Sequence, residues 1–468
     1  MSEHCGYVVK ISELNPHSNA DRLQIATIFG ASVIVGLDVK IGDLGVYFPI
    51  DLQLSEEYCA QNNLVRKKDE NGNNVGGYLD PDKRNIRAMK LRGEKSEGLF
   101  MPLESLAYTG ETKFEVGNKI DVLNGHEICR KYIPKVQNRQ GHVSEGNRTR
   151  KRRVPIAPLF AEHADTEQLA YNMEAFKPGD MIDITLKMHG TSGRTGYLPK
   201  LQGYKRTFWD WILRREGTPI YDWGYVTGTR RCVINDFNNG GGFYGDNAFR
   251  EPHARFFEGK LHKGETVYYE IVGFTNTGAP IMGQVANSKI SDKEFTKQYG
   301  KITTFSYGCE PTGKKMMHGT DEHGDFMLPV DAPQSDMYIY RMTMTNEDGD
   351  VVEYTPDFMR YRCEQIGAKC VMQFFDGCIP DATLLESFGM TAGEWIKEKA
   401  EEFYDGPDPI GKTHVREGVV IRIINRPKFC AYKHKNFNFK VLEGIAKDLA
   451  AAPDMEEAQD LIEEEDNA

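Results

Sequence analysis

The sequence predicts an α+β fold in which a small all-β barrel precedes a larger region of mixed strands and helices. Short runs rich in β-branched residues fill the chain up to about residue 120. Strand-like and helix-like stretches then follow one another between about residues 160 and 445, and a basic segment lies between the two parts. The length of 468 residues is enough for two or three domains, each with its own core.

The predicted barrel is built from short strands separated by turn signals. Asn15-Pro16 and Gly42-Asp43 mark turns between the strand-like runs "YVVKI", "DRLQIATI", "ASVIVGL" and "LGVYFPI". A further strand, turn and strand follow in "IRAMKLRGEKSEGLFMPL", whereas the polar "VRKKDENGNNVGGYLDPDKR" predicts a loop. Strands of this kind predict a small barrel without specifying its type. We assign residues 1–125 to it.

The segment 126–158 is predicted to be a basic linker. Its part from His126 to Pro155 ends in "RTRKRRVP", although the formal net charge of the chain is −11. Part of the negative charge lies in an acidic tail, 447–468, which has no Lys or Arg after Asp448. Because a local basic patch matters more to a phosphate backbone than the net charge does, we expect the linker to contact nucleic acid. A solvated hinge or a targeting signal is the alternative.

The cysteines and the hydropathy indicate the cellular compartment. Nine cysteines are scattered without a C-x-x-C pair, no signal peptide opens the chain, and no apolar run approaches the roughly 20 residues of a membrane span. We therefore expect a reduced cytoplasmic protein without structural disulfides or zinc and without membrane contact.

The larger region, 159–446, shows five strand patterns and two helical patterns. The helical stretches are "TPDFMRYRCEQIG" and "TAGEWIKEKAEEFY". The strands are predicted at 181–189, 266–273, 337–344, 417–424 and 429–435.

The first of these predicted strands contains a lysine, Lys187, within an otherwise apolar pattern. In "DMIDITLKMHGTSGRTGY", alternation places Ile182, Ile184, Leu186 and Met188 on one face. The opposite face then holds Lys187 and His189, and Gly190 allows a close turn directly afterwards. An ordinary surface strand is the alternative on spacing alone.

Other strands of the region also contain charged residues. Glu270 lies in "TVYYEIVG", Glu417 begins "EGVVIRI" with Arg422 inside it, and Lys433 and Lys435 share one face of "FCAYKHKNFNFKV". Charged groups within apolar strands are unfavourable unless they are used or paired. A functional site and a set of structural ion pairs are both consistent with this pattern.

The order of these segments resembles the covalent nucleotidyltransferases, which include ATP-dependent ligases and mRNA capping enzymes. "KMHGTS" is similar to their motif I, with the His of nick-sealing RNA ligases in place of the usual Asp, and "TGTRR" to a segment that supplies a nucleotide-binding Arg. "YYEIVG", "EGVVIR" and "YKHKN" resemble motifs III, IV and V. Two positions depart from the pattern: Leu186 replaces a frequent Glu, and Arg422 replaces a Lys. Strict alternation also places Glu417 and Arg422 on opposite faces, so a bulge or separate roles are expected.

The N-terminal part indicates the branch of this superfamily. "HSNADRLQIATI", "VIVGLDVKIGDLGVYFPID" and "LRGEKSEGLFMPL" resemble OB-type nucleic-acid-binding modules and the N-terminal module of the Deinococcus-type (RNA ligase 5) group. DNA ligases and capping enzymes instead carry an OB domain after motif V, where only about 28 residues follow Lys440 here. The resemblance implies a ligase-type nucleotidyltransferase domain, with antiparallel sheets and flanking helices, after an OB-like barrel.

The resemblance also implies the chemistry and the partners. Lys187 would attack the α-phosphate of ATP, AMP would pass to the 5′-phosphate of an RNA end, and the 3′-hydroxyl would displace AMP. Nicked duplex RNA or RNA ends are the expected partners, without an obligate protein partner. A DNA ligase, a GTP-using capping-type enzyme and a non-catalytic RNA-binding protein are the alternatives.

The implied site consists of catalytic and binding residues. The attacking amine must be neutral, so we expect the positive charge of Lys433, Lys435 and a bound metal to lower the pKa of Lys187 from about 10.4 toward 7–8. Glu270 and Glu417 would act in the opposite direction unless a cation neutralises them. The catalytic residues are Lys187, Lys433 and Lys435. Glu270 and Glu417 would bind Mg²⁺ or Mn²⁺. The nucleotide-binding residues are His189, Gly190, Thr191, Arg230, Arg231, Glu270, Tyr340, Glu417 and Arg422.

Tyr340 and the segment 204–216 each allow two interpretations. Tyr340 is expected to stack on adenine, and an ordinary core aromatic is the other interpretation. Residues 204–216, "YKRTFWDWILRRE", interleave basic and aromatic side chains, which suits either an RNA strand or an amphipathic packing element.

Overall fold

The computed structural model describes residues 4–70, 72, 75–133, 155–213, 215, 217–230, 232–237, 247–275, 281–282, 297, 316–321, 324–329, 335–410 and 415–448. Most of the expected linker and the acidic tail after Asp448 therefore lie outside the described residues. The chain divides into two units, one of Met1–Val136 with Lys440–Ala450 and one that includes Gln137–Phe439. Within the described ranges, no helix combines the length and the apolar character that crossing a membrane requires.

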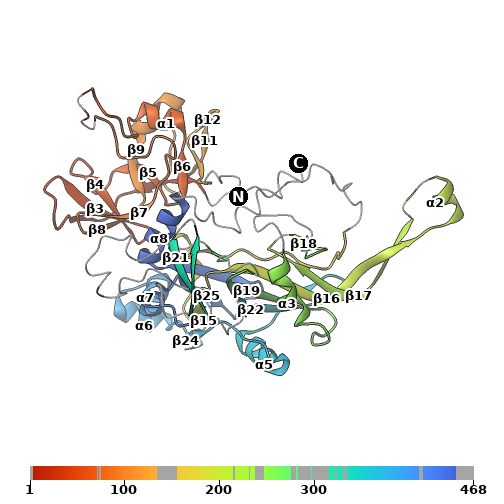
Figure 1. The fold of residues 1–468 in the computed structure, drawn as a ribbon. Helices are drawn as coiled ribbons and strands as arrows, with labels where there is room; N and C mark the ends of the chain where they lie inside the picture. The colour runs from red at the N-terminus through yellow and green to blue at the C-terminus, as the bar shows by residue number, and fades with distance from the viewer. Residues whose placement is uncertain are drawn as a thin grey trace. The chain divides into compact units, whose positions relative to one another are not determined.

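The N-terminal unit is made of short strands that pair in small antiparallel sheets (Figure 1). Its strands are β1 Gly6–Lys10, β2 Leu14–Pro16, β3 Leu23–Ile28, β4 Ala31–Gly36, β5 Leu44–Phe48, β6 Leu52–Leu54, β7 Ala88–Leu91, β8 Glu94–Glu97, β9 Leu99–Pro102, β10 Lys119–Ile120, β11 Val122–Leu123, β12 His126–Glu127 and β13 Cys129–Lys131. The largest sheet has the order β10-β1-β5-β9, and β2, β3 and β4 form a second. Pairing continues past residue 125, the expected end of the barrel, because β13 pairs with β6.

This unit also contains helical turns that the strand patterns in the sequence did not predict. Helix α1 covers Glu56–Gln61, and a 3-10 helix covers Leu103–Thr109. Ser55 caps α1 by accepting a hydrogen bond from the backbone of Tyr58, and the Tyr58 side chain is fully buried in the core. The sequence signal for this helix is a serine followed by two glutamates in the first turn.

The second unit contains two larger sheets. One has the order β14-β26-β25-β15-β24 and the other β18-β17-β16-β19-β22-β23. The strands of this unit are β14 Glu167–Gln168, β15 Met181–Leu186, β16 Thr191–Lys205, β17 Thr218–Gly228, β18 Val233–Ile234, β19 Glu265–Gly273, β20 Met316–Asp321, β21 Gly324–Pro329, β22 Ser335–Thr345, β23 Val351–Glu353, β24 Gln373–Cys378, β25 Gly418–Ile423 and β26 Cys430–Lys435. The five strands expected from the sequence are present within three residues at each end.

Helices pack against both sheets. The helices after residue 137 are α2 Phe208–Ile212, α3 Glu251–Arg255, α5 Pro356–Ile366, α6 Ala382–Phe388, α7 Ala392–Tyr404 and α8 Phe437–Asp448, with 3-10 helices at Leu169–Tyr171, Met173–Ala175 and Ala248–Arg250. Ile396 of α7 packs with Ile184 of β15 and Ile421 of β25. Met359 of α5 packs with Val267 of β19. Strands and helices thus form separate layers, and the α+β class is confirmed.

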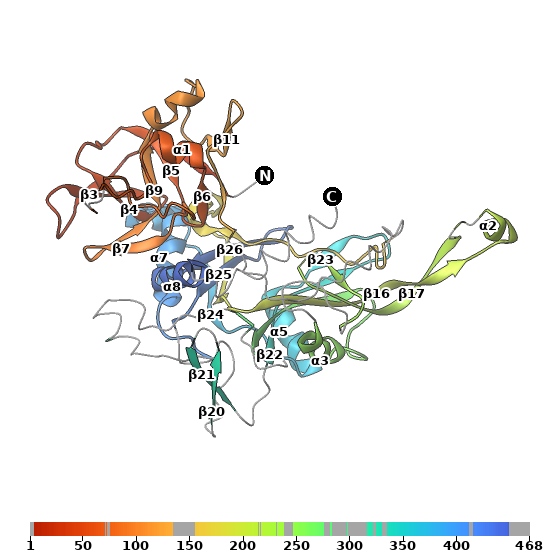
Figure 2. The same ribbon diagram turned by 45° about the horizontal axis from the view of Figure 1, so that its top comes forward.

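Strands β16 and β17 continue beyond their sheet as a two-stranded arm. Their pairing is antiparallel from Arg194↔Gly228 outward to Lys205↔Thr218. The outer part, residues 199–224, is called the arm here. In both views it extends away from the sheet that carries it, with α2 at its far end (Figure 1, Figure 2).

Candidate active site

Lys187 lies where the chain passes from one sheet of the second unit to the other. It follows β15, whose Ile182 and Ile184 are fully buried, and its backbone N–H donates to the carbonyl of Gly418 in β25 over 3.0 Å. Three residues later Gly190 passes close to β19, and a Cβ there would collide with the carbonyl oxygen of Ile271. A residue with a side chain does not fit at this turn, as the sequence suggested.

The Glu417 carboxylate contacts two side chains of this turn, Lys187 and His189, and also Lys435 of β26. One of its carboxylate oxygens lies 2.7 Å from Lys187 Nζ and 3.5 Å from Lys435 Nζ, and the other lies 3.2 Å from His189 Nδ1. Only 3% of the Glu417 side chain is exposed, so these ion pairs are shielded from water. Lys187 and His189 therefore point to the same group, as strand alternation predicted.

Gly418 interrupts regular strand geometry directly after Glu417. Gly418 has a φ of +150°, and a Cβ there would collide with the carbonyl oxygen of His434 in β26. After this glycine, β25 pairs regularly with β26, so Gly418 faces Lys435 and Val420 faces Lys433. Lys433 and Lys435 thus share the face of the sheet that Lys187 also occupies.

Burial and ion pairing act on the Lys187 amine in opposite directions. Burial alone would lower the pKa of Lys187, but the charge and hydrogen bond of Glu417 outweigh burial and the opposing charge of Lys435. The carboxylate of Glu270 acts in the same direction as Glu417, and the pKa of Lys187 is raised. The pKa of Lys187 is therefore not lowered, because the nearest charge to the amine is negative, and Glu270 and Glu417 act in the direction expected of carboxylates that no cation neutralises.

Glu417 is correspondingly held in its charged form. Burial would raise the pKa of this carboxyl, but the charges of Lys187 and Lys435 and the hydrogen bond from His189 hold the pKa well below its usual range. The site at neutral pH is therefore a buried carboxylate shared by two ammonium groups.

A second group of candidate residues surrounds Tyr340 on β22. Its ring lies 5.5 Å from that of His163, and the His163 ring is also 5.9 Å from the Tyr268 ring. Burial, together with the charges of Arg230 and Arg341, lowers the pKa of His163 to about 3, so its imidazole is neutral. Sequence reasoning missed His163, because a histidine in an irregular stretch gives no pattern to find.

The remaining candidates have partners within the second unit. Arg230 Nε donates to Asp165 over 2.8 Å, and Thr191 accepts a 2.7 Å hydrogen bond from the buried Arg250. Arg422 donates to the backbone carbonyl of Tyr354 over 2.9 Å and lies 3.7 Å from Glu353, away from the ion pairs of Glu417. Arg231 lies outside the described residues.

Phe439 is a second residue that sequence reasoning missed. Its ring lies 4.9 Å from the His189 ring in an edge-on arrangement and 5.7 Å from Lys435 Nζ. It is buried and directly follows the Lys-rich strand in "YKHKNFNFK", which is the signal that could have identified it. Its ring forms an apolar wall beside the charged groups.

The carboxylates near Lys187 fit a divalent cation only in combination with other ligands. Among the described residues, no group of three or more His, Cys, Asp or Glu is arranged to hold a metal. Glu270 and Glu417 offer hard oxygen atoms of the kind that Mg²⁺ and Mn²⁺ prefer, and such cations commonly combine one or two carboxylates with phosphate oxygens. The residues therefore fit a cation that binds together with a nucleotide.

Comparisons with known proteins agree with this architecture. A family model described as an OB-fold domain matches residues 6–103, and no curated protein matches the chain. The fold is similar to that of the Naegleria gruberi RNA ligase. A mutant of that protein with AMP and Mn matches with a TM-score of 0.51 and 15% identity, over 94% of this chain and 98% of that chain. Another mutant, with ATP and Mn, matches with a TM-score of 0.51 and 16% identity, over 93% and 97%.

These similarities define the fold class. The chain has an N-terminal OB-fold domain followed by an α+β unit with a ligase-like fold, as the sequence predicted. At this level of identity the similarity concerns the fold alone.

Proposed function

We propose that the protein is an ATP-dependent RNA ligase that joins 3′-hydroxyl and 5′-phosphate RNA ends, as in nick repair, through a lysyl–AMP intermediate. The observation that carries this proposal is the partly buried amine of Lys187, 2.7 Å from the buried Glu417 and next to Lys435, within a ligase-like fold. Solved structures of Naegleria gruberi RNA ligase mutants include one with AMP and Mn and one with ATP and Mn. We infer the same ligand class for this chain, with Mg²⁺ or Mn²⁺.

In the first step Lys187 acts as the nucleophile. Its Nζ forms a bond to the α-phosphorus of ATP, the bond from that phosphorus to the bridging oxygen breaks, and pyrophosphate leaves. The amine must first lose a proton and its contact with Glu417, because a charged ammonium has no free electron pair. Lys435 lies 3.5 Å from the same carboxylate oxygen and can retain the ion pair with Glu417 when Lys187 turns toward the phosphate.

The other side chains bind and orient the nucleotide in this proposal. Lys433 and Lys435 stabilise the negative charge that develops on the phosphates. Tyr340 stacks on adenine, and His189, Gly190, Thr191, Arg230 or Arg231, and Arg422 contribute to the nucleotide pocket. Glu270 and Glu417 are the residues that would hold a divalent cation, which when bound neutralises part of the phosphate charge.

The later steps require RNA. The AMP moves from Lys187 to the 5′-phosphate, and the 3′-hydroxyl then attacks that phosphate and displaces AMP. Each step has a good leaving group, so covalent catalysis divides one difficult joining reaction into easier ones. The OB-fold domain and the basic linker are assigned to RNA binding in this proposal.

Labelled nucleotide tests the proposal directly. The full-length protein incubated with α-labelled ATP and Mg²⁺ should form a labelled covalent adduct, and GTP should label it much less. Lys187→Ala should abolish the adduct but still seal, at a reduced rate, RNA that already carries a 5′-adenylate. A normal adduct on the Ala variant would refute the assignment of the nucleophile, and preferred labelling by GTP would favour a capping-type enzyme.

A further inference from the structure

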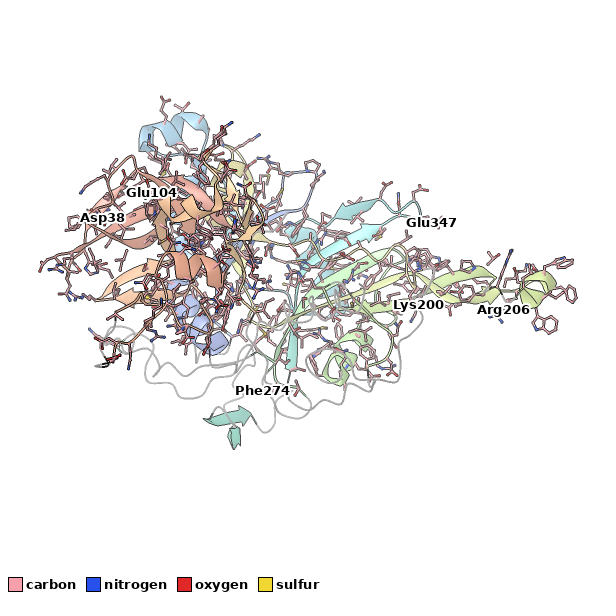
Figure 3. The ribbon with its side chains drawn as sticks, turned by 90° about the horizontal axis from the view of Figure 1, so that it is seen from above. Asp38, Glu104, Lys200, Arg206, Phe274 and Glu347 are labelled. Carbon is pink, nitrogen blue, oxygen red and sulfur yellow. The ribbon has the colours of Figure 1, made fainter. Side chains whose placement is uncertain are left out.

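The arm brings a group of aromatic side chains to a position far from the candidate active site within the same unit. Fourteen residue steps separate Thr191, beside the Lys187 turn, from Lys205 near the tip. At about 3.3 Å per step, β16 spans at most roughly 46 Å. Lys200 lies part of the way along the arm and Arg206 near its end (Figure 3).

The tip is a structured turn whose backbone is stabilised by a capping box. Thr207 and Asp210 form a capping box in which the Asp210 N–H donates to the Thr207 hydroxyl over 3.2 Å, and the Thr207 N–H donates to the Asp210 carboxylate over 2.9 Å. This box begins the single turn α2. It fixes a short helix that has no buried residue.

The side chains on this turn are large, apolar and exposed. The exposed fraction is 68% for Phe208, 67% for Trp209 and 70% for Trp211. The Phe208 ring lies 6.0 Å from that of Trp209 and 6.4 Å from that of Trp211. Solvent-exposed clusters of this kind mark binding surfaces, and the alternative of an amphipathic packing element does not agree with this exposure.

The charge around these rings is positive. Lys205, Arg206 and Arg215 are exposed beside them, while the Asp210 carboxylate accepts hydrogen bonds from Thr207. In sequence, residues 199–224 contain five Lys or Arg and three Asp or Glu, in a chain whose formal net charge is −11. Aromatic rings bordered by basic side chains are what a single-stranded polynucleotide recognises, because bases stack on the rings and phosphates pair with the cations.

We propose that the tip of the arm binds unpaired nucleotides of an RNA strand. Phe208, Trp209 and Trp211 stack on bases, and Lys205, Arg206 and Arg215 contact the adjoining phosphates. With a phosphate spacing of about 3.4 Å along a duplex strand, the reach of β16 corresponds to roughly a dozen nucleotides from the reacting end. This inference rests on the proposed function for the identity of the substrate and adds a second RNA-contacting site to it.

Variants of the exposed rings in the full-length protein test this inference. The Trp209→Ala/Trp211→Ala double variant is compared with Ile220→Ala, which removes an exposed apolar side chain elsewhere on the arm. The probes are fluorescein-labelled oligouridylates of 20 and 6 nucleotides, with binding measured by anisotropy and the AMP adduct measured on the same preparations. Because base–aromatic stacking supplies a large part of such binding, the double variant should bind the 20-mer at least about tenfold more weakly than the wild type. Ile220→Ala should bind normally, and adduct formation should be unchanged in both variants.

The outcomes separate this inference from the proposed function. Unchanged binding of the 20-mer by the double variant overturns the tip assignment even if the adduct forms normally. Absence of an adduct in the wild type overturns the ligase proposal, whereas a loss of 20-mer binding in the double variant still supports the tip. The inference is wrong if the full-length wild type binds phosphatidylcholine–phosphatidylserine vesicles through the tip and binds no RNA. It is also wrong if light scattering shows that the tip joins two copies of the chain.

Discussion

Lys187 is held by its surroundings in the protonation state that is unsuitable for attack. Burial favours a neutral amine, but Glu417 at 2.7 Å favours the ammonium and prevails. This arrangement keeps the Lys187 side chain charged and oriented, and in the proposed function it makes release from Glu417 a condition for nucleophilic attack. Glu417 then has two roles, first as the partner that restrains Lys187 and later as a candidate ligand for a cation.

Replacing Glu417 by Gln should lower the pKa of Lys187. The substitution removes the negative charge that raises this pKa most, and burial and Lys435, which lower it, then oppose only the weaker influence of Glu270. A group with a raised pKa stays protonated to higher pH, so in the variant the amine should become neutral at a lower pH than in the wild type. NMR titration of protein with ¹³C-labelled lysine measures this directly.

Glu402→Gln is the matched control for this titration. It removes a carboxylate from a surface pair with Lys399 at 2.9 Å on α7 and should leave the Lys187 titration unchanged. If Glu417→Gln raises the pKa of Lys187 or leaves it in place, the ion pair is not what determines the protonation state of the amine.

At the scale of elements, the turn between β15 and β16 depends on a backbone without a side chain. Gly190 lies against the backbone of Ile271 in β19, and that backbone cannot move aside without disturbing its sheet. The same turn carries Lys187 and His189, so the close approach of Gly190 to β19 also determines where Lys187, the proposed nucleophile, lies.

Gly190→Ala should therefore destabilise the second unit and displace Lys187. A side chain forced into a closely packed place typically costs about 1–3 kcal/mol of the free energy of unfolding. Urea unfolding gives the stability, and the yield of the AMP adduct reports the position of Lys187. Gly203→Ala is the control, because Gly203 lies on β16 with open space around it and should tolerate a methyl group. Equal stability of both variants would mean that the turn can adapt to a side chain.

The sequence was sufficient to predict the main strands of the second unit, but it was not sufficient to predict which side chains of different strands form ion pairs. Alternation identified the buried face of β15 and the common direction of Lys187 and His189, because a strand repeats every two residues. Alternation gave no indication that Glu417, 230 residues further along, would sit between Lys187 and Lys435, so it could not decide whether the carboxylates or the neighbouring lysines would determine the direction of the Lys187 pKa shift. At residues 204–216 basic and aromatic side chains suited two interpretations, and only the exposure of Trp209 and Trp211 distinguished them.

At the scale of the whole molecule, the candidate chemistry lies within one unit. Lys187, Glu417 and Lys435 all belong to the unit that includes Gln137–Phe439, so attack on ATP should not need the OB-fold domain. A protein consisting of residues 155–439 should form the AMP adduct. It should seal nicked RNA slowly, because the contacts expected from the OB-fold domain and the linker are lost.

Salt dependence provides the measurement for this separation. Contacts with phosphates release counterions, so the RNA affinity of the full-length protein should fall steeply as salt rises, and that of residues 155–439 less steeply. Both proteins are loaded with AMP beforehand, and their nick-sealing rates are compared. Equal rates and equal salt slopes would show that the OB-fold domain has no part in RNA binding.

Helix α8 gives the chain an unusual order of assembly during its synthesis. Phe437–Phe439 group with the second unit, while the helix from Lys440 onward groups with the N-terminal unit, where Lys440 Nζ lies 2.5 Å from a Glu97 carboxylate oxygen. At roughly 5–20 residues per second, a ribosome needs on the order of 15–60 s to proceed from the end of β13 to this helix. During that interval the N-terminal unit has been synthesised without the part of α8 that belongs to it. This part of α8 is translated only after every strand of the second unit.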